Sequence, residues 1–405
     1  MGGKVPGIRE LDKYLDSENI GAGFDITQRC QVKCPTCFYL PDKNFPLDMS
    51  FEDFGKTVGQ LIENKFRELY LLGGEPSLHP RVLDFVDYTM NIGAFNPVVF
   101  VTNGLRLADE NFCKRVADSG VIICTQRHAI GYDERKEMIQ DTVMGVKGTL
   151  RTVNKAFENI EKYFDPRKVA VQCCITKPVV ENGDIFDVFK YAREKGYMPM
   201  MEFTKEGQGF KRGCALDIPR EQILELFKKF QEFDRKYYPK LTAKFLSPQI
   251  YGGTCKLPYT GIHIKVNGDV IPCVGHQHVA FGNVFEGVLY NIDSTVQKRG
   301  VSLKEILENP LKKAFRDQRN LIHGYCKDEC EYAEPCAGGC RGSTYDITGC
   351  YVASFPYCPN IPKEINIRDI IPASCDNCFF EGNPTCSLNE EKVIQNLKKL
   401  GYSLY

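Results

Sequence analysis

Three cysteines, Cys30, Cys34 and Cys37, lie within eight residues of one another. Cysteine thiolates in such a group are ligands for zinc or for iron–sulfur clusters. A structural zinc ion would need a fourth protein ligand, which this segment lacks. A 4Fe–4S cubane held by three thiolates keeps one iron open, and an open iron supports reactive chemistry. The spacing therefore leaves two interpretations, a catalytic iron–sulfur cluster and a zinc loop with a distant fourth ligand.

A second, larger set of cysteines occupies the C-terminal half. The chain has 19 cysteines in all. In a cytosolic protein thiols stay reduced, so grouped cysteines indicate metal ligands rather than disulfides. The segment after residue 325 is rich in Cys, Gly and Pro and needs a metal to order it. The cysteines of this half are Cys255, Cys273, Cys326, Cys330, Cys336, Cys340, Cys350, Cys358, Cys375, Cys378 and Cys386.

The composition excludes several other classes of protein. Lys+Arg and Asp+Glu both number 52, so no overall charge attracts nucleic acid or an acidic membrane. Residues 1–16 have no apolar core of signal-peptide length, and no apolar run could form a transmembrane segment. We therefore expect a cytoplasmic protein, and its 405 residues are enough for two or more domains.

The residues before position 205 alternate between short apolar runs and amphipathic stretches. This alternation predicts parallel βαβ units with right-handed crossovers, arranged as an open partial barrel. In such sheets the functional loops follow the C-terminal ends of the strands. The predicted strands span 22–26, 68–72, 98–101, 121–124, 169–175 and 198–203, and the predicted helices span 51–63, 82–92, 110–117, 153–163 and 185–193.

The chain after residue 215 has a different pattern. A helix over 218–238 is expected to link the two parts. Residues 261–273 alternate and contain Asn267-Gly268, which predicts a β-hairpin. A further helix is predicted over 302–315.

Several motifs follow the expected strands in order. Together they resemble the radical S-adenosylmethionine (radical SAM) superfamily over roughly residues 20–205. The motifs are Cys30-x3-Cys34-x2-Cys37, then Gly73-Gly74-Glu75-Pro76 after the second strand, Thr102-Asn103-Gly104 after the third, and Thr176 after the fifth. The resemblance implies a partial (β/α)6 barrel whose three cysteines hold the catalytic 4Fe–4S cluster. It also implies that Glu75 contacts the amino group of the methionine portion and that Thr176 contacts the ribose.

The sequence departs from this family at two sites. Thr36 replaces the aromatic residue that often precedes the third cysteine, so Phe38 is expected to contact the cofactor instead. After the fourth strand, where many relatives carry Asp, the chain has Gln126, Arg127 and His128. Gln126 and Arg127 could face substrate or cofactor and His128 could carry a proton, although ordinary loop polarity explains them equally well.

The adjacent residues Cys173 and Cys174 point to opposite faces of the fifth strand, so one would face the barrel interior. That cysteine could donate a hydrogen atom to a substrate radical, or both could be small core residues.

The C-terminal cysteine pattern, with Gly268-x4-Cys273 and Ala337-Gly338-Gly339-Cys340-Arg341-Gly342, resembles the SPASM extension of radical SAM enzymes, a small cysteine-rich α+β domain. The interval Cys326-x3-Cys330 is one residue longer than usual. The resemblance implies two auxiliary 4Fe–4S clusters, one on Cys326, Cys330, Cys336 and Cys358, and one on Cys255, Cys273 and Cys340 with an undefined fourth ligand. These clusters could also have a purely structural role and serve only to stabilise the fold of the domain.

Four cysteines remain outside that pattern, Cys350, Cys375, Cys378 and Cys386. They could form a third auxiliary cluster or a single-ion zinc or iron site. Free thiols are an equal alternative.

These observations predict an N-terminal segment (1–20), a radical SAM barrel (21–215), a linker helix (216–250), a SPASM domain (251–360) and a cysteine-containing tail (361–405). The predicted enzyme cleaves S-adenosylmethionine and removes a hydrogen atom from a peptide or protein, with flavodoxin or ferredoxin as electron donor. Residues 1–20 are too few for the peptide-recognition domain of many relatives. A dehydrogenase, epimerase or carbon–carbon bond-forming enzyme acting on a sugar, aminoglycoside, tetrapyrrole or lipid is therefore an alternative. A non-catalytic Fe–S or zinc scaffold is another.

Overall fold

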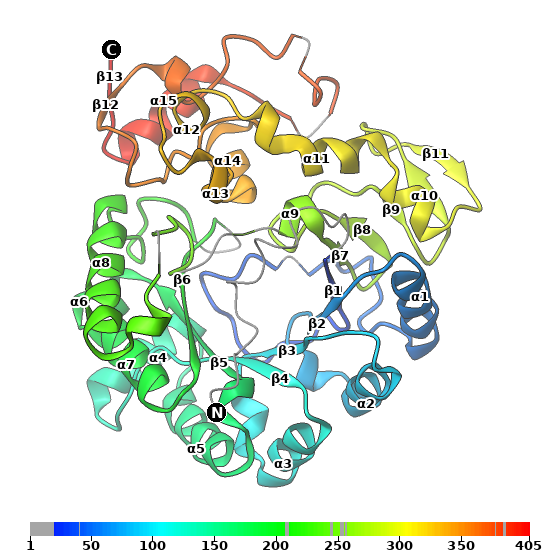
Figure 1. Cartoon of the computed structure of the whole chain (residues 1–405), viewed down its shortest axis with the longest axis vertical. Coiled ribbons are helices and arrows are strands. Elements are labelled where there is room, and N and C mark those ends of the chain that lie inside the picture. The colour runs from blue at the N-terminus through cyan, green and yellow to red at the C-terminus, as the bar shows by residue number, and fades with distance from the viewer. Residues whose placement is uncertain are drawn as a thin grey trace.

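The computed structural model describes residues 20–39, 41–206, 210–243, 246–251, 255, 257–376, 378–383 and 386–405. Most of the expected N-terminal segment, residues 1–19, lies outside these ranges. The first half of the chain forms six parallel strands arranged as a curved sheet with helices on its outer side (Figure 1). The predicted α/β partial barrel is therefore confirmed. Its strands are β1 (Gly21–Asp25), β2 (Glu68–Leu72), β3 (Val98–Thr102), β4 (Ile122–Gln126), β5 (Val169–Ile175) and β6 (Met198–Phe203).

Helices connect successive strands as the pattern predicts. Helix α4 was not predicted, because its apolar residues form only a short stripe among charged ones. It begins where the Asp133 side chain accepts a hydrogen bond from the N–H of Lys136. The helices of this half are α1 (Phe51–Glu63), α2 (Val82–Ile92), α3 (Glu110–Ser119), α4 (Glu134–Met144), α5 (Thr149–Tyr163), α6 (Lys177–Glu181) and α7 (Asp184–Glu194).

Aromatic side chains join the sheet to its outer helices. Phe24 of β1 meets Phe54 of α1 edge to face, with ring centroids 4.8 Å apart, and Phe54 contacts Phe85 of α2 at 4.6 Å. All three side chains are fully buried. Burial of large rings is the main stabilising contribution here, and it fixes the position of β1 and of the loop that follows it.

The expected linker helix is present as α8 (Arg220–Tyr237). It packs on α7, where the rings of Phe189 and Phe230 stack with centroids 4.3 Å apart. Arg193 of α7 also forms a two-pronged ion pair with Asp234 of α8, at 2.9 and 2.7 Å. Helix α8 therefore extends the outer helical layer of the barrel.

The predicted hairpin forms from β7 (Ile262–Ile264) and β8 (Asp269–Ile271), with Gly268 in its turn at φ +91°. Strand β7 pairs in parallel with β1, so the barrel sheet continues into the C-terminal half. Strands β9 (Gly282–Asn283), β10 (Val288–Tyr290) and β11 (Val296–Arg299) extend it further. The boundary expected near residue 215 stays a prediction, since one sheet of the described chain spans both sides of it.

The helix predicted over 302–315 is wrong in its bounds, because two helices, α10 (Leu303–Leu307) and α11 (Pro310–Leu321), occupy this region. Pro310 has no N–H and cannot continue α10. The side chain of Asn309 instead accepts a hydrogen bond from the N–H of Leu311 at 2.8 Å and caps the new helix.

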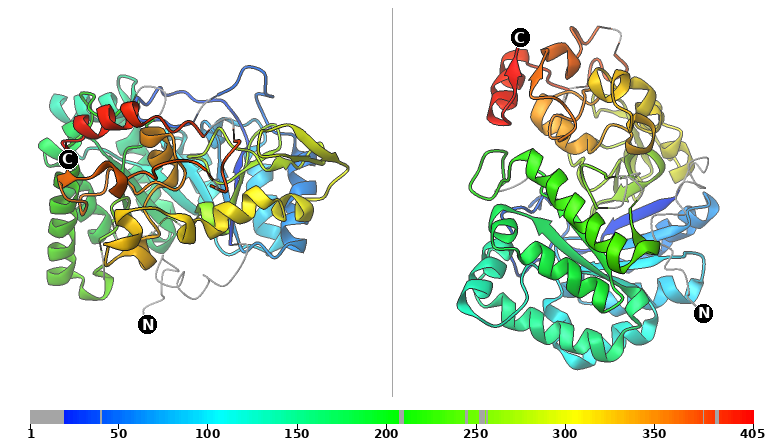
Figure 2. Two further views of the ribbon diagram at one scale, coloured as in Figure 1. Left: turned by 90° about the horizontal axis from the view of Figure 1, so that it is seen from above. Right: turned by 60° about the vertical axis from the view of Figure 1, so that its left-hand side comes forward.

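The remaining C-terminal elements form a layer along the open side of the partial barrel, above β6 and β7 in Figure 1 and facing the viewer in the left view of Figure 2. None of the helices in the described ranges is both long and apolar enough to cross a membrane. The elements are α9 (Leu257–Thr260), α12 (Tyr325–Asp328), α13 (Ala333–Cys336), α14 (Arg341–Thr348), β12 (Glu364–Ile365), the 3₁₀ helix η6 (Ile367–Asp369), α15 (Glu390–Lys399) and β13 (Ser403–Leu404). Other short 3₁₀ helices lie earlier in the chain: η2 (Pro76–Leu78), η3 (Leu105–Ala108), η4 (Pro166–Lys168) and η5 (Pro239–Leu241).

Candidate functional site

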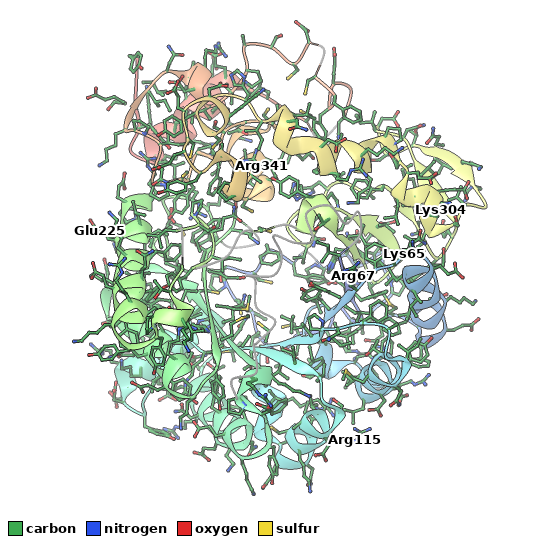
Figure 3. The ribbon with its side chains drawn as sticks, in the orientation of Figure 1. Lys65, Arg67, Arg115, Glu225, Lys304 and Arg341 are labelled. Atoms are coloured by element: carbon green, nitrogen blue, oxygen red, sulfur yellow. The ribbon has the colours of Figure 1, made fainter. Side chains whose placement is uncertain are left out.

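A cavity of about 520 Å³ occupies the inside of the partial barrel. Cys30, Cys34 and Cys37 line it beyond the C-terminal ends of the strands. Toward the other ends of the strands it is lined by Arg67, which Figure 3 shows beside the central opening. Cys255 from the C-terminal half also lines it. The predicted ligands after β1 and one cysteine of the second set therefore face the same space.

The three cysteines after β1 lie close together. The N–H of Cys37 donates to the carbonyl of Cys34 at 3.0 Å, which closes a tight turn between them. Burial raises the pKa of the Cys34 thiol, and the neighbouring thiols of Cys174, Cys37 and Cys30 raise it further. A bound cation would offset this cost, because it favours the thiolate form.

The two glycines after β2 allow the second motif to approach the cysteine loop. A Cβ on Gly73 would lie 2.4 Å from the carbonyl oxygen of Thr27, and a Cβ on Gly74 would lie 2.4 Å from that of Arg29. Gly73 also has a φ of +146°, which favours glycine. Both positions thus require glycine, because any side chain would clash with the backbone segment that precedes Cys30.

The carboxylate of Glu75 links the second motif to the third. It accepts hydrogen bonds from the Thr102 hydroxyl and the Asn103 N–H, both at 2.6 Å. Glu75 is buried, and burial raises the pKa of its carboxyl group although these donors lower it. Pro76 begins the short helix η2 and is also buried.

Asn103 connects the third motif to the cysteine loop. Its side chain exchanges two hydrogen bonds with Gln31, both at 3.3 Å, and it also hydrogen-bonds to the thiol of Cys30. Gly104 has a φ of +83°, and a Cβ there would lie 2.3 Å from the hydroxyl of Thr125 on β4. The structure therefore brings together all three motifs that the sequence singled out.

The β4–β6 side of the cavity carries polar side chains among apolar ones. Gln126 and His128 line the cavity, and within the described chain neither the Oε1 atom of Gln126 nor the Nε2 atom of His128 has a hydrogen-bond partner. Burial lowers the pKa of His128 to about 3, so its ring is neutral. Its Nδ1 atom accepts from the N–H of Cys174 at 3.4 Å, which places the ring proton on Nε2.

The other residues predicted to act at the site differ in whether they line the cavity. The Arg127 guanidinium lies away from the cavity, between the rings of Phe157 and Tyr191 at 4.6 Å from each. Thr176 is fully buried, does not line the cavity, and its hydroxyl has no partner among the described residues. Phe38 does line the cavity. Of the adjacent pair predicted to face opposite ways, Cys174 lines the cavity, while Cys173 is in the core.

The second set of cysteines forms separate groups. One group of four surrounds a small space of about 20 Å³ that Phe355 also lines. The pKa of one member, Cys358, is raised by burial and then by the other three thiols. The four cysteines are Cys326, Cys330, Cys336 and Cys358.

A second group gathers at the mouth of the barrel. Burial raises the pKa of Cys273 to about 12, with contributions from Cys255 and Cys340. The ammonium group of Lys205 lies among these three thiols. Burial lowers the pKa of Lys205, but its electrostatic interactions with the carboxylate of Glu202 and with these cysteines together outweigh burial and raise this pKa.

Comparison with known proteins identifies both halves of the chain. The profile of the radical SAM superfamily matches residues 24–176, and that of SPASM, an iron–sulfur cluster-binding domain, matches residues 255–331. The chain therefore contains a radical SAM domain and a SPASM domain. Its radical SAM domain binds a 4Fe–4S cluster and S-adenosylmethionine, and its SPASM domain binds iron–sulfur clusters.

Individual radical SAM proteins resemble this chain along most of its length. The antilisterial bacteriocin subtilosin biosynthesis protein AlbA of Bacillus subtilis is 24% identical over 79% of this chain, which spans 66% of AlbA. The PqqA peptide cyclase of Bradyrhizobium diazoefficiens is 21% identical over 84% of this chain and 85% of its own. The solved structure of native anSMEcpe with bound AdoMet and Kp18Cys peptide has a TM-score of 0.60 at 18% identity, covering 94% of this chain and 96% of that one. It shares the fold.

The radical SAM and SPASM domains offer donors that suit their cofactors. Cys30, Cys34 and Cys37 supply three thiols at the edge of a cavity where Gln126 presents an unpaired buried oxygen. No group of three or more His, Cys, Asp or Glu side chains in the described ranges is arranged to hold a metal ion. A cubane requires a different arrangement, because each of its thiolates binds a separate iron.

Two charged residues at the end of β6 and just after it belong to none of the motifs predicted from the sequence. Glu202 and Lys205 both line the cavity, and Glu202 accepts a hydrogen bond from Gln172 at 2.6 Å. On β6, residues 198, 200 and 202 alternate with buried ones. A charged residue in this inward series was the signal that could have identified Glu202.

Arg341 of the predicted SPASM motif lies in the C-terminal half, above the barrel in Figure 3. Its side chain is buried, and its guanidinium donates to the carbonyls of Gly338 and Ala353, the latter at 2.7 Å. It therefore joins the loop before Cys340 to the segment that leads to Cys358.

Proposed function

We propose that this protein is a radical SAM/SPASM oxidoreductase that modifies a peptide or protein. One observation carries the proposal: a single cavity is lined by Cys30, Cys34 and Cys37 of the radical SAM domain and by Cys255 of the SPASM region. Substrate in this cavity would lie between the two iron–sulfur sites. When bound, the cluster and S-adenosylmethionine supply a 5′-deoxyadenosyl radical that removes a hydrogen atom from the substrate.

The residues around the cavity would orient the cofactor and substrate. Glu75 and Asn103, fixed by their mutual hydrogen bond, would shape the place of the methionine portion. Gln126 would present its unpaired oxygen, and the neutral ring of His128 its Nε2 proton, to polar groups of the bound molecules. Lys205 would neutralise negative charge between the two iron–sulfur sites.

We assign the SPASM cysteines to two auxiliary clusters. Cys326, Cys330, Cys336 and Cys358 would hold one, since all four surround one small space. Cys255, Cys273 and Cys340 would hold the other, beside the cavity. We further propose a flavodoxin or ferredoxin as electron donor and a cytoplasmic location, where thiols stay reduced.

A peptide or protein substrate is favoured by the relatives that resemble this chain. AlbA takes part in biosynthesis of the bacteriocin subtilosin, PqqA peptide cyclase acts on a peptide, and anSMEcpe was solved with a peptide bound. These statements concern those proteins, and they support the same substrate class here.

The activity is tested by purifying the protein without oxygen, reconstituting it, and following 5′-deoxyadenosine after dithionite and S-adenosylmethionine are added. We expect formation that is lost in the Cys30→Ala, Cys34→Ala, Cys37→Ala triple variant. The control is Cys214→Ala, which changes a cysteine outside these groups and should leave formation intact. Equal formation by the triple variant would contradict the proposal.

The substrate class is tested with extracts of cells grown in deuterated medium. The extract is separated by size, and each fraction is incubated with the unlabelled enzyme. Deuterium transferred to 5′-deoxyadenosine from the peptide and protein fraction is expected. Transfer only from the small-molecule fraction would instead show that the substrate is a small molecule.

A further inference from the structure

Four cysteines that neither predicted SPASM ligand set uses converge in the C-terminal tail. Cys375 and Cys378 are joined by a turn in which the N–H of Cys378 donates to the carbonyl of Cys375 at 3.0 Å. The thiol of Cys375 hydrogen-bonds to that of Cys386. The Cys386 thiol interacts electrostatically with the thiols of Cys350, Cys375 and Cys378. The thiols of Cys350 and Cys386, which are 36 positions apart in sequence, thus lie close together.

Backbone amides point at these sulfur atoms. The thiol of Cys350 accepts hydrogen bonds from the N–H groups of Val352 and Ala353. The thiol of Cys386 accepts one from the N–H of Tyr351. Such donors stabilise the negative sulfur of a metal-bound thiolate. The thiolate is the form of cysteine that binds metal.

The chain also makes room for this convergence. Gly349 has a φ of +67°, and a Cβ there would lie 2.3 Å from the carbonyl oxygen of Ser387. The N–H of Ser387 donates to the carbonyl of Gly349 at 3.0 Å, and the Cys386 thiol contacts the same carbonyl at 3.7 Å. Any other residue at position 349 would push Cys386 away from Cys350.

The tail is fixed to the core between its cysteines. Phe380, which follows Cys378, is fully buried, and its ring lies 5.0 Å from that of Tyr351 and 5.3 Å from that of Phe315. Cys375, Cys378 and Cys386 are nevertheless only half-buried. The buried ring of Phe380 therefore holds the tail in place, while the three cysteines remain partly exposed to solvent.

A short chain of rings connects this group to the SPASM cysteines near the cavity. The Cys273 thiol lies 3.2 Å from Nδ1 of His276. The ring of His276 stacks with that of Tyr351, with centroids 6.1 Å apart, and Tyr351 adjoins Cys350 in sequence. A redox-active metal bound by the tail cysteines would thus lie close to the predicted cluster at Cys273. A zinc ion there could not exchange electrons with that cluster, because zinc has no redox chemistry.

We propose that Cys350, Cys375, Cys378 and Cys386 hold a third auxiliary 4Fe–4S cluster. It would exchange one electron with the cluster at Cys273, so that one of them is reduced as the other is oxidised. Four thiolates match the ligand requirement of such a cluster. The same chain already binds iron–sulfur clusters in two other domains, so iron and sulfide are supplied to it. The proposal does not depend on the reaction proposed above.

The proposal is tested on the whole, anaerobically reconstituted protein by measuring iron and acid-labile sulfide. The wild type is expected to hold about sixteen irons, and the Cys378→Ser and Cys386→Ser variants about twelve, with about four sulfides lost as well. Cys214→Ser is the matched control and should lose none. Retention of the electron paramagnetic resonance change caused by S-adenosylmethionine shows that each variant has folded.

Two outcomes would overturn the third cluster. Loss of about one zinc or one iron without sulfide would show a single-ion site. Unchanged metal and sulfide would show that the four thiols are free. A second measurement avoids variants that fail to fold: in the wild type, Cys375, Cys378 and Cys386 should resist alkylation until the clusters are removed by a chelator, while Cys214 reacts throughout. Alkylation of these three in the loaded protein would also contradict the proposal.

Discussion

The backbone N–H of Asn103 donates to the carboxylate of Glu75 at 2.6 Å, joining the ends of two neighbouring strands. Asn103 also contacts the Cys30 thiol, and the residue before Glu75 packs on the carbonyl of Arg29. Two motifs after β2 and β3 thus hold the loop that carries the first cysteine. Their residues act as one unit, so a change in one should displace the others.

We expect Gly74→Ala to disturb this unit without touching any cysteine. Its Cβ would lie 2.4 Å from the carbonyl oxygen of Arg29, so the loop before Cys30 must move. A displacement of about 1 Å at a reacting centre can cost about 100-fold in rate. The measurements are 5′-deoxyadenosine formation and iron content, with a loss of about four irons expected. Gly59→Ala is the control, because a Cβ there meets nothing within 4 Å; equal behaviour of the two variants would refute this role of Gly74.

We expect Lys205→Met to lower the reduction potential of the auxiliary cluster assigned to Cys255, Cys273 and Cys340. The ammonium lies among these thiols and over the ring of Phe38 at 4.9 Å, so its positive charge favours the more negative, reduced cluster. The measurement is a redox titration followed by electron paramagnetic resonance. The separate variant Lys205→Arg keeps the positive charge and should have nearly the reduction potential of the wild type. An unchanged potential in both variants would rule out this electrostatic effect.

We expect Asp234→Ala to destabilise the barrel by about 3–5 kcal/mol. Arg193 would lose both of its contacts at 2.9 and 2.7 Å and remain as an uncompensated charge with 10% of its side chain exposed. Tyr251 would lose its 3.0 Å hydrogen bond to the same carboxylate. Denaturant unfolding measures the effect. Glu52→Ala, which removes the exposed ion pair with Lys56, should leave stability almost unchanged.

We expect Asp346→Asn to remove a pH dependence of stability. Burial and the nearby Glu206 raise the pKa of Asp346 to about 7 in the folded protein. In the unfolded chain this group ionises near pH 4. Between about pH 4 and pH 7 the folded state holds a proton that the unfolded state has released, so wild-type stability falls as the pH rises. At pH 8 the variant should be more stable by about 1–3 kcal/mol, and below pH 4 the two should be equal. Parallel melting curves across this range would exclude the effect.

The positions of the strands could be predicted because their signals are local. The alternation of apolar runs with amphipathic helices placed each of the six barrel strands within one or two residues, and Asn267-Gly268 placed the hairpin. Helix α4 was missed because tertiary contacts, rather than a strong apolar stripe, stabilise it. The prediction of a single helix over 302–315 was wrong because a new helix begins at Pro310. Pro310 is a local signal for a helix start, but the periodic apolar pattern on both sides of it hid this signal.

The sequence by itself determined which residues could bind iron and sulfur, because cysteine spacing within a loop is a local property. It also determined that the motifs after β2 and β3 lie at one edge, since parallel strands end together. Only the tertiary structure decided which distant residues share a site. It brought Lys205 to the thiols of Cys255, Cys273 and Cys340, turned Arg127 away from the cavity, and joined Cys350 to Cys386. These outcomes depend on the packing of segments far apart in the chain, which no local pattern encodes.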